Sequence, residues 1–216
     1  MRNRRGLFAG MQSGRLSGFV PYKGTKDLPN AGRISRFIRN FVDMKVALCQ
    51  FSMEWEAAAR NLRRAEELVA QAGADLALLP EMFATGFVTE PWRTALPDEE
   101  ELLAWMRRTA RRYATALAGS AVVRSGDRFA NRFFFVRPAG GAERYDKRHL
   151  FSIGGEDAHF VAGRRRVVVE YGGLRFLPLV CYDLRFPVWC RCRSDYDAIL
   201  CVASWPAPRR EVWRTL

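Results

Sequence analysis

The chain has 216 residues, of which 49% are hydrophobic and 27% charged, a globular composition that excludes collagen, wholesale disorder and small disulfide-stapled folds. No apolar run approaches the roughly 18 to 20 residues of a membrane span, so no segment is expected to cross a membrane, and no membrane partner is expected for the body of the chain. The net charge is +12, but residues 1–43 carry nine Lys and Arg against two Asp, whereas residues 44–216 carry 26 basic and 21 acidic residues. Because the excess lies in a tail and in dispersed arginines, we expect no nucleic-acid partner for the body of the chain.

The five cysteines are odd in number and irregularly spaced, in a chain long enough to fold without disulfides. This pattern favours a reducing, cytoplasmic compartment. The two histidines, His149 and His159, lack the i, i+4 spacing of a metalloprotease helix, and only one residue separates Cys190 from Cys192. No zinc site is therefore expected.

Residues 1–43 show no sustained hydrophobic period and are rich in Gly, Ser, Arg and Pro, which predicts a basic, disordered extension. Two origins remain open for it, an organellar transit peptide or a coding start placed upstream of the true first residue, Met44. A basic arm that binds RNA or a membrane surface is a third possibility. Residues 44–216 are predicted to form one domain.

The regular pattern begins with an apolar strand at 45–51, followed by a helix at 54–71 whose apolar stripe starts at Trp55 and which ends before Gly73. A second, buried strand is predicted at 74–79. The order strand, helix, strand predicts a right-handed βαβ unit with both strands in one sheet.

A second helix is predicted to begin after Asp98, which can cap it together with Glu101. Strands at 117–124 and 128–137 follow, joined by a turn around Gly126. Later elements are expected as strands at 166–171, 174–181 and 198–203 and as a helix at 210–216. The fold class is α/β.

Two of the predicted strands deliver a reactive side chain at their carboxyl ends, Glu81 and Cys181, where α/β sheets place their active sites. A nucleophilic thiol needs a proton acceptor or a neighbouring cation, which Glu81 and Lys147 can supply, and we expect the ammonium to lower the pKa of the thiol. Each residue also has a plainer interpretation: an inert core cysteine, a surface acid and a solvated lysine.

Three motifs together resemble the nitrilase, or carbon-nitrogen hydrolase, superfamily: LLPEMFATGF at 78–87, YDKRHLF at 145–151 and LVCYDLRFPVW at 179–189. Their wording, with SWPAPR at 204–209, is most similar to the omega-amidase branch, which hydrolyses 2-oxoglutaramate. The resemblance covers residues 44–216.

The resemblance implies a four-layer αββα sandwich, a homodimer, and a catalytic triad that falls here on Glu81, Lys147 and Cys181. It also implies a second glutamate, carried over to Glu156, for which a loop acid is the alternative. Members of the superfamily continue with further strands beyond the position of Leu216, so the resemblance implies a chain that is incomplete at its C-terminus. Activity is therefore expected of a full-length parent and is open for this chain.

The implied reaction is hydrolysis of a small amide through a thioester on the cysteine, with no metal or organic cofactor. The backbone of Tyr182 is expected to help bind the oxyanion, and Arg185 to bind a substrate carboxylate unless it pairs with Asp183 or Glu156. Four aromatic residues either narrow the pocket or belong to the core: Phe83, Phe87, Tyr182 and Trp205. The alternatives are the same triad acting on an N-carbamoyl amine, a nitrile or another amide, and an inactive fragment that serves as an interaction module.

Overall fold

The computed structural model describes residues 12–14, 44–93 and 98–215. From the predicted extension it describes one short strand, β1 (Gln12–Gly14), which pairs antiparallel with β2 (Val46–Leu48). The remainder of residues 1–43 lies outside the described residues, so the disordered extension stays a prediction. In the described part of the chain, no helix has both the length and the apolar character that a bilayer crossing requires.

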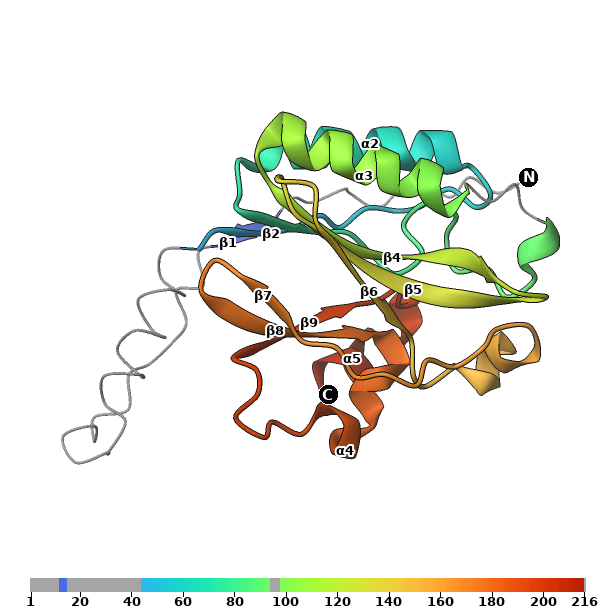
Figure 1. Ribbon diagram of the computed structural model, residues 1–216. Coiled ribbons are helices and arrows are strands. Elements are labelled where there is room, and N and C mark those ends of the chain that lie inside the picture. Colours follow the sequence, from blue (N-terminus) through green and yellow to red (C-terminus); the bar gives the residue numbers. More distant parts are fainter. Residues whose placement is uncertain (1–11, 15–43, 94–97, 216) are drawn as a thin grey trace, which may run out of the picture.

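The larger sheet has six strands in the order β1-β2-β3-β4-β5-β6, with β2, β3 and β4 parallel and β4, β5 and β6 antiparallel. Helices α2 and α3 cover one of its faces (Figure 1). The elements not yet bounded are β3 (Leu76–Leu78), β4 (Ala116–Ser125), β5 (Arg128–Val136), β6 (Ala142–Asp146), α2 (Ala58–Ala72) and α3 (Glu99–Tyr113).

The predicted βαβ unit is present as β2, α2 and β3, and α2 ends at Gly73 in the left-handed conformation that glycine tolerates. The helix begins four residues later than predicted, and Trp55 is 67% exposed instead of lying on its buried stripe. The cause is Asn61, whose side chain accepts from the N–H of Glu54 at 2.8 Å and donates to the carbonyl of Glu54 at 2.7 Å. These two bonds hold the preceding residues in a turn.

The second predicted helix is also present, with Asp98 as its N-cap. The Asp98 carboxylate accepts from the N–H of Glu100 at 2.8 Å. The first turn of α3 is acidic and its last turn carries arginines, which matches the polarity of the helix dipole.

Strand β6 was not predicted, because the sequence around Tyr145 reads as a polar loop. Only Tyr145 of this strand is fully buried, and the strand pairs on one side alone, with β5 (Phe133 opposite Tyr145). A half-exposed edge strand can carry Glu and Arg, so it lacks the apolar alternation that predicts a strand. Because β6 ends at Asp146, Lys147 directly follows a strand and not a loop residue.

The second sheet contains β7 (Val169–Tyr171), β8 (Leu174–Val180) and β9 (Ala198–Val202), with β7 and β8 antiparallel and β8 and β9 parallel. It lies on the face of the larger sheet opposite α2 and α3, so that Figure 1 shows a helix layer and two sheet layers in that order. Separate apolar clusters fill the two interfaces: Leu68, Leu103 and Phe134 lie between helices and sheet, and Phe133, Phe135 and Phe176 between the sheets. This stacking brings the carboxyl end of β8 toward β5 and β6.

Candidate active site

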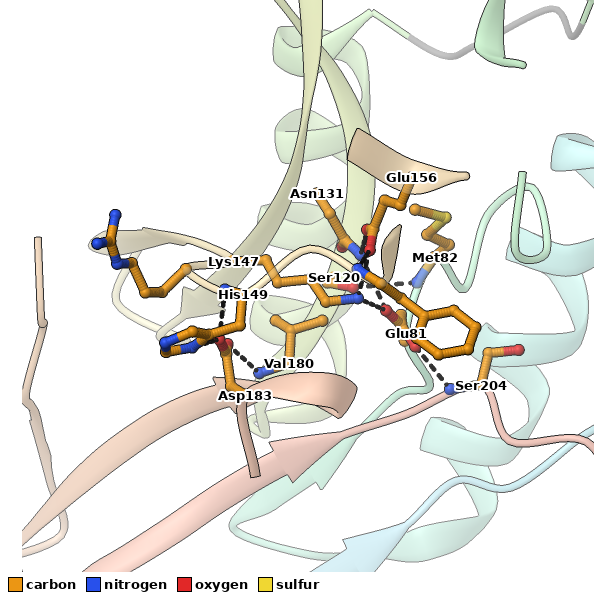
Figure 2. Close-up of polar contacts among 12 residues, drawn as sticks. Glu81, Met82, Ser120, Asn131, Lys147, His149, Glu156, Val180, Asp183 and Ser204 are labelled. Carbon is orange, nitrogen blue, oxygen red and sulfur yellow. Dashed lines mark hydrogen bonds and ion pairs between the residues drawn. The ribbon is translucent and has the colours of Figure 1, made fainter. Parts of the chain in front are cut away.

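Three buried charged side chains meet between the two sheets. Glu81 follows β3, Lys147 follows β6, and Glu156 begins a 3₁₀ turn, η4 (Glu156–Ala158). The Lys147 Nζ lies 2.8 Å from Glu81 Oε1 and 2.8 Å from Glu156 Oε2, and all three side chains are 0% exposed (Figure 2). Glu81 and Glu156, which are 75 residues apart in the sequence, therefore meet at Lys147, as the resemblance implies.

Asn131 of β5 bridges the two carboxylates, and the sequence analysis missed it. Its Nδ2 donates to Glu81 Oε1 at 2.9 Å and to Glu156 Oε1 at 3.0 Å (Figure 2). Its Oδ1 is buried and has no hydrogen-bond partner among the described residues. The signal was an amide within the otherwise apolar buried face of RFANRFFFV, a position where a polar side chain requires partners.

Backbone N–H groups donate further hydrogen bonds to the two carboxylates. The N–H of Ser204, just after β9, donates to Glu81 Oε2 at 3.0 Å, and the N–H of Phe151 donates to Glu156 Oε2 at 2.7 Å. In the described structure, both carboxylates act only as hydrogen-bond acceptors, as ionised carboxylates do. The cluster thus corresponds to two carboxylates sharing one ammonium.

Lys147 stays protonated in this environment. Burial alone acts to lower the pKa of its ammonium, but the negative charges of Glu81 and Glu156 outweigh burial and raise the pKa above its ordinary value. Lys147 is therefore a fixed positive charge and not a proton acceptor in the resting site.

Cys181 directly follows β8 and is the first residue of a 3₁₀ turn, η5 (Cys181–Arg185). Its φ of 47° lies in the left-handed region, which costs a non-glycine residue on the order of 1–3 kcal/mol. The residue is 9% exposed, so its thiol is enclosed but not sealed. A hydrogen bond and a charge interaction link this thiol to Glu81, and a charge interaction links it to Lys147.

Lys147 acts to lower the pKa of the Cys181 thiol, as expected, but the net pKa in the resting site is raised. Burial is the largest influence, and together with the charge of Glu81 it raises the pKa of Cys181 well above its ordinary value, while Lys147 opposes the shift without reversing it. The motifs indicate a neighbouring ammonium but not how deeply the thiol is buried. Cys181 is consequently a neutral thiol, and it requires a proton acceptor as it attacks.

Asp183 ties the segment of Cys181 to the segment of Lys147. Its Oδ2 accepts from the N–H of Val180 at 3.0 Å and from the hydroxyl of Tyr145 at 2.8 Å. Its Oδ1 accepts from the N–H of His149 at 2.9 Å and lies 2.9 Å from the Nδ1 of the same residue (Figure 2). A single buried carboxylate therefore sets how the turn after β8 sits against the end of β6.

Replacing Asp183 with asparagine is expected to lower the free energy of unfolding by about 1–3 kcal/mol, because an amide nitrogen then faces N–H and O–H donors. We also expect kcat for the amide hydrolysis that the resemblance implies to fall, since Cys181 and Lys147 lose their common anchor. Urea unfolding and steady-state kinetics measure the two effects, with exposed Asp157→Asn as the matched control. Unchanged kcat in a destabilised Asp183→Asn protein would contradict the positioning role.

The aromatic residues expected to line the substrate pocket lie in different parts of the structure. Phe83 is fully buried in the core between the helices and the larger sheet and packs on Trp105, which matches the core alternative. Phe87 borders the charged cluster, because Lys147 Nζ lies 5.8 Å from the centroid of its ring. Trp205 follows Ser204 on the segment that leaves β9.

Tyr182 and Arg185 lie in the turn after the nucleophile. The ring of Tyr182 is half-buried, with a centroid 5.2 Å from that of Phe151. Arg185 is exposed and, within the described chain, forms no ion pair with Asp183 or Glu156, whose carboxylates bind the groups named above. The ion pair considered from the sequence is therefore absent.

The cysteines and the other candidate ligands form no metal centre in the described ranges, where no group of three or more His, Cys, Asp or Glu side chains could hold an ion. All five cysteines are free thiols.

The arrangement of buried carboxylates, one ammonium and an enclosed thiol suits acyl transfer to sulfur. Residues 45–215 match the carbon-nitrogen hydrolase family, and the chain belongs to this family. It is 46% identical to omega-amidase YafV of Yersinia enterocolitica over 174 residues, which are 80% of this chain and 68% of that protein. Over 178 residues it is 29% identical to the 2-oxoglutaramate amidase of Bacillus subtilis (strain 168), covering 79% of this chain and 69% of the relative.

Solved structures agree. A CN-hydrolase superfamily protein from Xanthomonas campestris, with an arsenic adduct in its active site, superposes with a TM-score of 0.74 at 37% identity, covering 80% of this chain and 69% of that one. The amidase of Nesterenkonia sp. AN1, in a mutant with acrylamide added to its active-site cysteine, gives 0.68 at 25% identity, over 78% and 70% of the two chains. The described fold is thus a partial nitrilase fold, and the predicted family is confirmed. The protein is an omega-amidase-like carbon-nitrogen hydrolase.

Proposed function

We propose that Cys181 hydrolyses the ω-amide of a small substrate that carries a carboxylate at its other end, with 2-oxoglutaramate as the preferred compound. The observation that carries this proposal is the contact of Lys147 with both Glu81 and Glu156 beside the thiol. The similarity to omega-amidase YafV supports the choice of substrate.

In the first half of the reaction, the Cys181 sulfur attacks the amide carbonyl carbon and the thiol proton moves to Glu81. The tetrahedral oxyanion is stabilised by the Lys147 ammonium and by the N–H of Tyr182. When the carbon–nitrogen bond breaks, Glu81 passes its proton to the leaving nitrogen, which departs as ammonia. The acyl group remains on sulfur as a thioester.

In the second half, a water molecule attacks the thioester carbonyl while Glu81 accepts one of its protons. The carbon–sulfur bond breaks, the proton held by Glu81 returns to the Cys181 sulfur, and the new carboxyl group loses its remaining proton to solvent, so that the product leaves as a dicarboxylate. Whenever Glu81 is neutral, Glu156 still offers Lys147 a carboxylate at 2.8 Å, which keeps the ammonium in place. Asn131 holds the two glutamates at a fixed separation throughout.

We also propose the finer features that the family resemblance implies: a complete four-layer αββα sandwich, a homodimer and a cytoplasmic location. The helix–sheet–sheet order supports the first. The five free thiols support a reducing compartment.

The test is ammonia release from 2-oxoglutaramate, compared with an N-carbamoyl amine and a nitrile of similar size. We expect 2-oxoglutaramate to give the highest kcat/KM, and Cys181→Ala to abolish its turnover, while the exposed Cys192→Ala serves as the matched control. Faster turnover of either other substrate would overturn the substrate assignment. Turnover that persists in Cys181→Ala would overturn the mechanism.

A further inference from the structure

A substrate with a carboxylate at its far end requires a cation close to the charged cluster but outside it. Lys147 does not serve, because the proposed mechanism uses its ammonium at the reacting amide carbonyl, the opposite end of the substrate from this carboxylate. The cluster contains two carboxylates and one ammonium, so its net charge opposes an approaching anion. A second positive group must therefore offset the substrate's charge.

We propose that Arg209 binds the distal carboxylate of the amide substrate and so selects carboxylated amides; this inference rests on the proposed function. The Arg209 guanidinium carbon lies 5.2 Å from the ring centroid of Trp205 and 5.8 Å from that of Phe151. The indole N–H of Trp205 donates to the Arg209 carbonyl at 2.7 Å. Ring stacking and this bond fix both the backbone and the charged end of the residue.

The backbone segments that carry these two rings also contact the buried glutamates. The N–H of Phe151 holds Glu156 at 2.7 Å, and the N–H of Ser204, directly before Trp205, holds Glu81 at 3.0 Å. The Phe151 ring also packs on Tyr182, the residue after the nucleophile. The guanidinium thus packs against two rings whose backbone segments also contact the two buried glutamates.

The charge of Arg209 is available for a ligand. Its side chain is exposed, and no carboxylate within the described ranges pairs with it. Four of the less exposed arginines differ, since they pair with acids of the fold: Arg132, Arg137, Arg166 and Arg175. A stacked guanidinium without an acidic partner presents two parallel N–H groups, the geometry that a carboxylate accepts.

The rival is Arg185, which was expected from the sequence to bind this carboxylate. It is exposed on the turn after Cys181, and in the described part of the chain it stacks on none of the rings that border the cluster. The structure therefore favours Arg209 over Arg185, and variants of both decide between them.

The test compares 2-oxoglutaramate with pentanamide, an uncharged amide of the same carbon-chain length, in the full chain. For Arg209→Ala we expect KM for 2-oxoglutaramate to rise by about 10- to 100-fold, the effect of losing a charged hydrogen-bonded pair, with kcat/KM for pentanamide unchanged. Arg209→Lys retains the charge without the paired N–H groups and should fall between. The neighbouring exposed Arg210→Ala is the matched control.

A binding measurement separates this inference from the proposed function. Glutarate, a dicarboxylate that cannot be hydrolysed, should slow alkylation of Cys181 by iodoacetamide in the wild-type chain and lose this protection in Arg209→Ala. Protection that depends on Arg209 supports the inference even if 2-oxoglutaramate is not turned over, in which case only the substrate assignment fails. Equal losses on both amides, protection unaffected by Arg209→Ala, or its loss in Arg185→Ala instead would each overturn the assignment of Arg209.

Discussion

Replacing Glu81 with glutamine is expected to slow ammonia release by about 10²- to 10⁴-fold while making Cys181 easier to alkylate. The two effects have one cause. Glu81 is the acceptor of the thiol proton in the proposed mechanism, and in the resting protein its negative charge also raises the pKa of that thiol. Glutamine can neither accept the proton nor exert the charge, whereas Lys147 still acts to lower the pKa.

The measurement is the rate of Cys181 alkylation by iodoacetamide as a function of pH, read by mass spectrometry. Because the thiolate is the reacting form, a lower thiol pKa moves the alkylation profile to lower pH in Glu81→Gln. Glu170→Gln, an exposed change of the same chemistry on β7, should alter neither profile nor turnover. A Glu81→Gln profile that stays in place or moves to higher pH would show that Glu81 does not act on Cys181.

The residues that perform the proposed chemistry were predictable because they stand in recognisable motifs, and for Glu81 and Cys181 because the motif ends an apolar run. Glu81 and Cys181 follow buried strands, and the carboxyl ends of strands are where side chains can converge. The βαβ unit was predictable for a related reason, since the hydrophobic period of α2 and the apolar runs of β2 and β3 are local signals.

The groups that position these residues were not predicted, because their importance comes from contacts between distant parts of the chain. Asn131 and Asp183 are single polar residues in apolar surroundings, and nothing local indicates that one meets two glutamates and the other joins two segments. Arg209 stands in the quoted SWPAPR segment beside Trp205, but its contact with the distant Phe151 ring arises only on folding. The raised pKa of Cys181 depends on burial, which a motif does not reveal.

Replacing Lys147 with methionine is expected to lower the free energy of unfolding at neutral pH by about 3–5 kcal/mol, the usual cost of leaving buried charge uncompensated. Methionine nearly matches the length of the lysine side chain, so the change leaves little empty space. It removes the ammonium at 2.8 Å from each of Glu81 and Glu156, and two fully buried carboxylates then remain together. Urea unfolding gives the difference, and exposed Lys45→Met is the matched control.

The same pair of proteins tests the direction of the Lys147 pKa. Since the folded-state pKa is raised above the ordinary lysine value of 10.5, the ammonium's contribution to stability is fully present below that value and is lost as the pH rises through the folded-state pKa. The stability gap between wild type and Lys147→Met should therefore stay constant at neutral and mildly alkaline pH and narrow only in strongly alkaline solution. A gap that closes already below the ordinary lysine pKa would mean that burial, and not the two glutamates, governs this lysine.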